Sequence, residues 1–182
     1  AIAEGIRAEK LDPLSPIIGA DLGNILMRAR RFDEALAQLN RVLALDPTFF
    51  VTYWYFGMTR YGKGQYPEAV AEYRKALALN DNPWVKALLV QSLAKAGQRS
   101  EAAKLLSELD ADSGRRYVAN SSLALAYGAL GEKDKAFALL NKEIEERGSR
   151  TVVFSVNPIW DDLRDDPRFA DLLSRVEASK LD

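Results

Sequence analysis

The sequence predicts an all-α fold built from antiparallel pairs of helices, and three observations support this prediction. Apolar residues recur at the i, i+3, i+4 and i+7 spacing of amphipathic helices, as at Leu36, Leu39, Val42 and Leu43. Helix-breaking glycines separate these stripes, at Gly62, Gly64, Gly97 and Gly131. Similar phrases also return at a fixed interval: Leu45-Asp46-Pro47 repeats Leu11-Asp12-Pro13 after 34 residues. Each helix pair is therefore expected to be one unit of a repeat.

The composition is that of a folded protein and excludes several kinds of site. Of the 182 residues, 48% are hydrophobic and 28% charged, close to the globular average. The net charge is -1, without the basic excess typical of nucleic-acid binders. The chain has no Cys and no His, which removes disulfides, thiolate or imidazole metal sites and the usual catalytic triads. No apolar run approaches the roughly 18 residues that a membrane helix needs.

An alanine-ending phrase marks each repeat. Its four copies are Arg31-Phe32-Asp33-Glu34-Ala35, Gln65-Tyr66-Pro67-Glu68-Ala69, Gln98-Arg99-Ser100-Glu101-Ala102 and Glu132-Lys133-Asp134-Lys135-Ala136. With Leu22-Gly23 earlier and Pro47 later in the first unit, this pattern resembles the tetratricopeptide repeat (TPR). The resemblance implies a single array over 1–182 with the right-handed α-α superhelix of a TPR solenoid. The full repeats are expected at 16–49, 50–82, 83–116 and 117–150.

The two ends depart from complete repeats. Ala1 aligns with the twentieth position of a unit, so 1–13 should be the second helix of a truncated repeat, with a helix over 1–12. We interpret the chain as a fragment of a longer protein; a processed or atypical first repeat is the alternative. At the other end, Pro158 would break the first helix of a fifth unit, so 151–182 is expected to be a C-terminal cap.

The cap should end in a helix that begins at Pro167, with Asp166 as its N-cap. Phe169, Leu172, Leu173 and Val176 fall on one face of this helix, and Trp160, Leu163, Phe169 and Leu172 should be largely buried against the helices of 117–146. The cap phrase also resembles the tail that closes TPR regions of large bacterial signalling proteins. The resemblance implies a kinase, cyclase or winged-helix domain elsewhere in such a protein.

The family resemblance further implies a binding surface on the first helix of each unit. The residues that we expect to bind a peptide there are Asn24, Met27, Arg28, Trp54, Met58, Tyr61, Trp84, Gln91 and Lys95. Aromatic residues and Met suit such a surface because they are enriched at protein interfaces. Two alternatives stay open: Trp54 would be core if its helix were rotated by one residue, and Trp84 could pack on the preceding helix.

The predicted function is a protein-protein interaction scaffold that binds a partner peptide or helix in the concave groove. The alternative is a regulatory or structural segment that packs on its own neighbour domain. Capture of chaperone tails by a two-carboxylate clamp is not expected, because only Asn24 matches that motif. We predict no enzyme activity, cofactor, metal, nucleic acid or membrane partner, because no phosphate-binding loop occurs and the carboxylates fall on exposed helix faces. The sequence does not name the partner, the compartment or the oligomeric state, and a cytoplasmic location is the default expectation.

Overall fold

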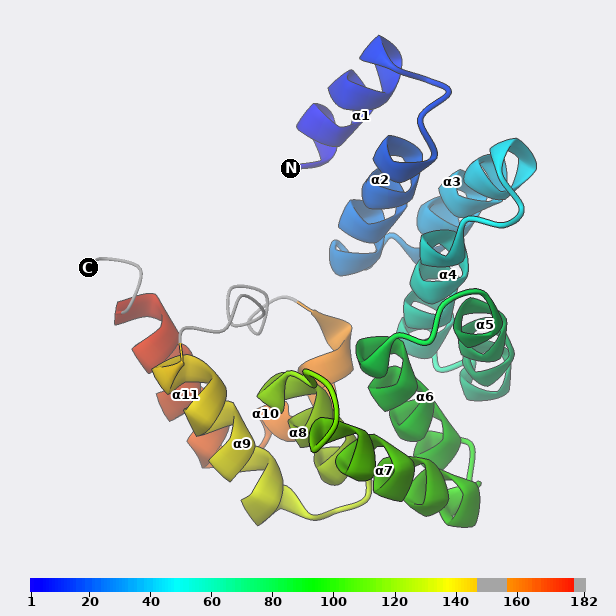
Figure 1. The fold of residues 1–182 in the computed structure, drawn as a ribbon. Helices are drawn as coiled ribbons and strands as arrows, with labels where there is room; N and C mark the ends of the chain where they lie inside the picture. Colours follow the sequence, from blue (N-terminus) through cyan, green and yellow to red (C-terminus); the bar gives the residue numbers. More distant parts are fainter. Residues whose placement is uncertain (147–156, 179–182) are drawn as a thin grey trace. The chain divides into compact units, whose positions relative to one another are not determined.

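The computed structural model describes residues 1–146 and 157–178, and every regular element in these ranges is helical. The elements are α1 Ile2–Leu11, α2 Pro16–Arg28, α3 Phe32–Leu45, α4 Phe50–Gly62, α5 Tyr66–Leu79, α6 Pro83–Lys95, α7 Arg99–Ser113, α8 Asn120–Ala129, α9 Lys133–Glu145, the 3-10 turn η2 Pro158–Trp160, α10 Asp161–Arg164 and α11 Pro167–Ala178 (Figure 1). The predicted all-α class is thus confirmed. The helices group into two compact units, 1–85 and 86–182, and each is considered by itself below.

Most predicted turns lie where the sequence placed them, because left-handed residues end the helices. Gly64, Gly97 and Gly131 have φ values of +77°, +81° and +90°, which glycine adopts without a steric penalty. In each case the chain closes the preceding helix: the N–H of Gln98, for example, donates to the carbonyl of Leu93 at 2.8 Å. Arg30, with φ 58°, takes the same place after α2.

One predicted boundary is wrong. The repeat expected at 117–150 implied a first helix from Tyr117, whereas α7 continues to Ser113 and α8 begins only at Asn120. Tyr117 lies outside any helix and is 84% exposed. At the start of α8 the buried carboxylate of Glu143 on α9 accepts the backbone N–H of Ser121 at 3.0 Å and so caps the helix.

Small residues let the helices of unit 1 approach closely. Gly57 on α4 faces the ring of Tyr73 on α5, and a methyl group placed on Gly57 would lie only 2.6 Å from Cδ1 of that ring. Gly23 on α2 faces Leu39 on α3 in the same way, at 2.8 Å. Tyr73 and Leu39 are both fully buried. The glycine of each pair therefore makes room for a large side chain of its partner helix.

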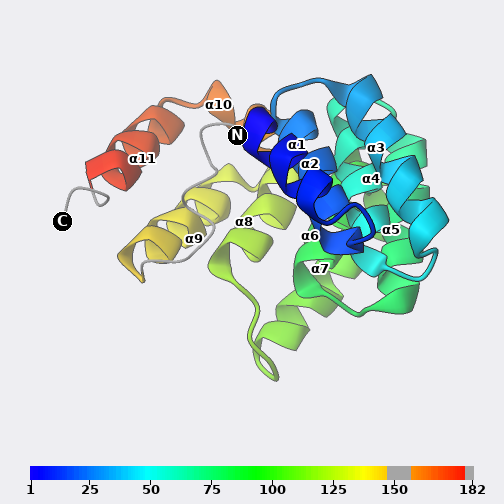
Figure 2. The same ribbon diagram turned by 90° about the horizontal axis from the view of Figure 1, so that it is seen from above.

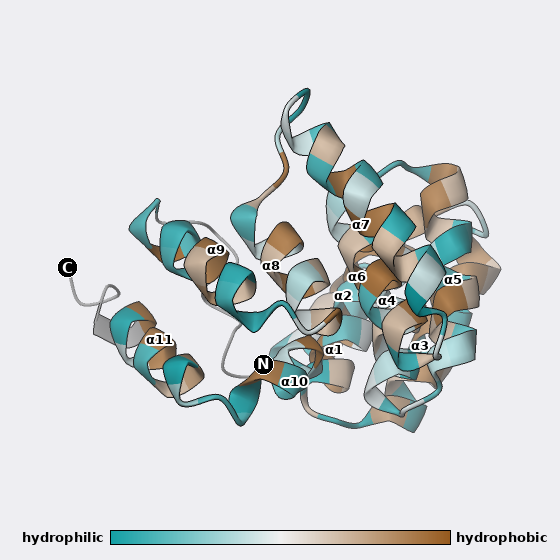
Figure 3. Ribbon diagram, turned by 90° about the horizontal axis from the view of Figure 1, so that it is seen from below, coloured by the Kyte–Doolittle hydropathy of each residue, from teal (hydrophilic) through white to brown (hydrophobic). Residues whose placement is uncertain are grey.

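The described part of the C-terminal segment, 157–178, packs on α8 and α9 of unit 2, and the rest of the predicted cap lies outside the described residues. The cap residues Trp160, Leu163, Phe169, Leu172 and Val176 are all buried, and α11 packs beside α9 (Figure 2). In Figure 3 the ribbons of α9 and α11 carry alternating hydrophilic and hydrophobic bands, as amphipathic helices do. Asp166 accepts the N–H of Arg168 at 3.1 Å, which confirms it as the cap of α11. The guanidinium of Arg168 lies 4.3 Å from the ring centroid of Phe137 on α9.

Within the described residues, no helix is both long and apolar enough to cross a membrane.

Candidate functional site

In unit 1 the first helices α2 and α4 pack against each other and carry a polar cluster centred on Tyr55 (Figure 1). The hydroxyl of Tyr55 donates to Oδ1 of Asp21 at 3.2 Å, and the side chain of Asn24 also hydrogen-bonds it. Burial, reinforced by the negative charge of Asp21 and the hydrogen bond to it, raises the pKa of Tyr55 to about 12; the positive charge of Arg28 partly opposes this. The phenol is therefore a neutral donor at physiological pH.

Three polar atoms around this cluster are buried and have no hydrogen-bond partner among the described residues. They are Oδ1 of Asn24, Nε of Arg28 and Nε1 of Trp54. Asn24 is only 9% exposed, whereas Arg28 and Trp54 remain partly exposed. A buried polar group without a partner costs about 1–3 kcal/mol. Because each of these atoms is shielded, a ligand can pair with it only when the side chain that carries it moves.

An aromatic patch borders the same cluster on α4. Trp54 stacks on Phe50, with ring centroids 6.5 Å apart and planes 15° apart, and its ring lies 5.1 Å from that of Tyr55. Because α2 and α4 together hold both the polar cluster and this patch, we call the set Asp21, Asn24, Arg28, Phe50, Trp54 and Tyr55 the Trp54 surface. It offers a partly exposed aromatic ring for apolar contact beside one unpaired acceptor and two unpaired donors, whose atoms are themselves buried.

Only part of the sequence-predicted set lies on this surface: Asn24, Arg28 and Trp54. The other four predicted residues of unit 1 are buried, namely Met27 (0% exposed), Met58 (3%), Tyr61 (7%) and Trp84 (5%). Direct contact between these four and a peptide was expected, and in the described structure their burial leaves them as packing residues. The physical reason is that a first helix has neighbours on several sides: α2 contacts α1, α3 and α4. Little of its surface therefore stays open.

The last two predicted residues lie in unit 2 and already have partners there. Nε2 of Gln91 donates to the carbonyl of Ile159 at 2.7 Å, and Nζ of Lys95 lies 2.6 Å from Oδ1 of Asp162. Their expected contact with a foreign peptide is therefore replaced by contact with the C-terminal segment of the chain itself.

Sequence reasoning missed Asp21, Phe50 and Tyr55. One indication was available, because Asp21, Asn24 and Arg28 follow the i, i+3, i+7 spacing of a single helix face. Tyr55 lies one 34-residue period after Asp21, so the repeat places the two on neighbouring first helices, although the period alone does not reveal the hydrogen bond between them.

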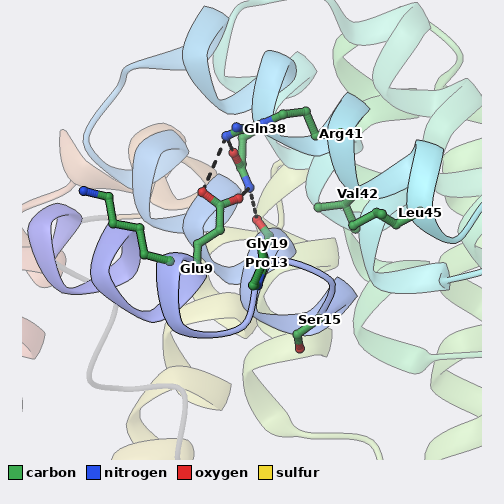
Figure 4. Close-up of a pocket in the computed structure, with 9 residues that line it drawn as sticks. Glu9, Pro13, Ser15, Gly19, Gln38, Arg41, Val42 and Leu45 are labelled. Atoms are coloured by element: carbon green, nitrogen blue, oxygen red, sulfur yellow. Dashed lines mark hydrogen bonds and ion pairs between the residues drawn. The ribbon is translucent and has the colours of Figure 1, made fainter.

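A second concave site lies between α1, α2 and α3, and Figure 4 shows its lining. It is a cavity of about 350 Å³ whose central side chain is the buried Gln38. Gln38 donates to Glu9 and to the carbonyl of Gly19, and it accepts from Arg41, which also pairs with Glu9 at 3.6 Å. These polar groups satisfy one another, so the cavity offers less to a ligand than the Trp54 surface. The described residues contain no cluster of acidic side chains that could hold a metal ion.

Comparison with known proteins relates these units to one family. Models of the tetratricopeptide repeat match residues 20–49 and 60–120. A search of curated proteins found no match. Among solved structures the chain is similar to YrrB, described as a TPR protein with an unusual peptide-binding site, at 19% identity over 100% of this chain and 95% of that one, with a TM-score of 0.57.

Two further structures are similar. MamA is 22% identical over 80% of this chain and 86% of its own, with a TM-score of 0.56. The human IFIT1 dimer with PPP-AAAA is 21% identical over 89% of this chain and 41% of its own, with a TM-score of 0.59. At such identities the likenesses establish the fold, and they support the predicted α-helical solenoid.

Proposed function

This chain belongs to the tetratricopeptide repeat family, and from that premise we propose that it is an interaction scaffold that binds a partner peptide on the Trp54 surface. The observation that carries the proposal is the gathering of unpaired Asn24 Oδ1, Arg28 Nε and Trp54 Nε1 on two adjacent first helices. Peptide binding by a relative of this fold, YrrB, agrees with it.

The free atoms are of the kind that a peptide backbone satisfies. After a small movement of the side chains that exposes these atoms, Oδ1 of Asn24 accepts a hydrogen bond from a peptide N–H, while Nε1 of Trp54 and Nε of Arg28 donate to a peptide carbonyl. These contacts do not depend on the side chains of the peptide, so they fix its course along α2 and α4 without selecting its sequence.

Selection for side chains is assigned to the aromatic patch. The partly exposed indole of Trp54, supported by Phe50, offers contact area at a low cost in side-chain entropy. The exposed carboxylate of Asp21 and the guanidinium of Arg28 add one charge of each sign at the edge of the patch. The preferred ligand is therefore a peptide with an apolar or aromatic anchor and no strong net charge.

The test begins with a random peptide library selected on the immobilised full chain. The best peptide, labelled with a fluorophore, is then titrated by anisotropy against the parent and single variants. Trp54→Ala should weaken binding by about 2 kcal/mol or more, which is roughly 30-fold. Trp54→Phe keeps a ring but loses the indole donor, so its affinity for the peptide should lie between those of the parent and Trp54→Ala.

Arg74→Ala, an exposed change on the second helix α5, serves as the control and should leave the affinity within about twofold of the parent. The proposal fails if Trp54→Ala and Asn24→Ala bind the selected peptide as tightly as the parent does. It also fails if Arg74→Ala abolishes binding.

A further inference from the structure

In unit 2 the chain places one of its own segments on first helices. This cis segment, Asn157–Arg164, contacts α6 through Gln91 and Lys95, as described above, and it packs on α8. A methyl group placed on Gly128 of α8 would lie 3.3 Å from Cδ2 of Leu163, so the leucine side chain rests where α8 has no side chain of its own.

The contacts of the cis segment resemble those of a bound peptide more than those of a simple apolar cap. Its apolar side chains Ile159, Trp160 and Leu163 are between 1% and 3% exposed. Helix α6 also makes two polar contacts with the segment. Gln91 pairs with the main-chain carbonyl of Ile159, and Lys95 pairs with the carboxylate of Asp162. The bond to the main-chain carbonyl orients the segment, and the Lys95–Asp162 ion pair adds a contact that depends on its sequence.

The segment also holds its own shape. Oδ1 of Asn157 accepts the N–H of Ile159 at 3.2 Å, and Arg164 donates both to Asp161 at 2.7 Å and to the carbonyl of Asn157 at 3.2 Å. These bonds lie within eight consecutive residues, so a short peptide of this sequence carries the groups that order it. Pre-ordering of this kind lowers the entropy cost of binding.

One acceptor in the contact is left without a partner. Gln91 is 2% exposed, and its Oε1 has no hydrogen-bond partner among the described residues, although its Nε2 is paired. The cis segment therefore fits the surface incompletely. A ligand with the same pattern and one additional N–H at this place would form a contact that the cis segment does not.

We propose that the surface of α6 and α8 is a second, self-occupied recognition site, specific for a protein segment of the pattern apolar–aromatic–acidic–acidic–apolar. In this chain Ile159-Trp160-Asp161-Asp162-Leu163 fills it in cis. The partner it fits is a segment with the same pattern, which competes with the cis segment. This site involves none of the residues of the Trp54 surface, so either proposal can fail without the other.

The cis segment is tethered, so a free peptide competes against an effective concentration in the millimolar range. A labelled synthetic peptide of residues 157–166 should therefore bind the parent chain only weakly. Binding should improve at least tenfold in the full-length Asp162→Lys variant, because that change opposes Lys95 while leaving every apolar contact of the segment in place. The affinities are measured by fluorescence anisotropy, with circular dichroism to establish that each variant is folded.

A charge-reversal series tests specificity. In the Lys95→Glu chain the native peptide should be rejected, whereas a peptide carrying the Asp162→Lys change should bind at least tenfold better than the native one. Lys104→Glu, an equal charge change on the exposed face of α7, is the matched control and should not alter the preference.

The proposal is overturned if the folded Asp162→Lys chain binds the native peptide no better than the parent does. It is also overturned if Lys95→Glu leaves the preference between the two peptides unchanged. Should Asp162→Lys not fold, Asp162→Asn, which removes only the charge, takes its place in the same titration, with the same two outcomes.

Discussion

Replacing Gly57 with alanine tests how closely α4 and α5 pack. The expected sign comes from two opposing terms. Alanine favours the helix over glycine by up to about 1 kcal/mol. Against this, the new methyl group would lie 2.6 Å from Cδ1 and 2.7 Å from Cζ of Tyr73, well inside van der Waals contact.

The clash outweighs the helix preference because the obstacle is a rigid ring. Tyr73 is completely buried and cannot turn toward solvent, so one helix must move away from the other. Overpacking of this kind costs about 1–3 kcal/mol, and the close approach to several ring atoms places Gly57→Ala at the upper end of that range. The net loss of stability should be about 2 kcal/mol. With a denaturant dependence of about 2 kcal/mol per molar urea, the unfolding midpoint should fall by about 1 M.

Gly23→Ala is the matched control, because it occupies the corresponding position of the preceding repeat. Its methyl group would lie 2.8 Å from Cδ2 and 2.9 Å from Cγ of the equally buried Leu39, and an isobutyl group can change rotamer more readily than a phenol ring can shift. Its midpoint should therefore change by much less. Urea unfolding is followed by circular dichroism at 222 nm for parent and both variants. If Gly57→Ala is as stable as the parent, or if Gly23→Ala is the more damaging change, the argument from ring rigidity is wrong.

Three further predictions concern stability. Phe169 is 2% exposed, so Phe169→Ala should leave a cavity and lower the free energy of unfolding by about 3–5 kcal/mol. The exposed Tyr117→Ala is the control and should change it little. A loss below about 1 kcal/mol in urea unfolding of Phe169→Ala would show that α11 is not a cap. Burial raises the pKa of Tyr73 well above 10. Above about pH 10 the unfolded chain therefore loses a proton from this phenol that the folded chain keeps. The free energy of unfolding should then fall by up to about 1.4 kcal/mol per pH unit. Urea midpoints between pH 8 and 11.5 should therefore fall less steeply in Tyr73→Phe, and equal slopes would contradict this. Glu143→Ala should cost about 1–3 kcal/mol because it leaves the N–H of Ser121 unpaired, and faster hydrogen exchange at that amide is the readout; unchanged exchange would refute the cap.

The order of the helices was within reach of the sequence because it depends on local chemistry. Glycines with positive φ end helices, and prolines such as Pro16 and Pro167 begin them, wherever they fall in the repeat. The apolar stripe of the cap likewise follows from the spacing of Phe169, Leu172 and Val176 along one helix. The start of α8 at Asn120 did not follow from the repeat expected at 117, and there the N–H of Ser121 pairs with Glu143 of another helix.

Which first-helix residues remain open to a partner was decided only by tertiary structure. The repeat pattern gives Met27 and Trp54 equivalent roles, yet the first is fully buried and the second is partly exposed, because exposure depends on what each neighbouring helix covers. In the same way, the bond from Tyr55 to Asp21 joins residues 34 apart, and Gln91 reaches Ile159 across 68 residues. The repeat period relates such positions but does not specify their hydrogen bonds, so the sequence determined the helices and their pairing, while the packed chain alone determined which side chains stay exposed and which polar atoms stay unpaired.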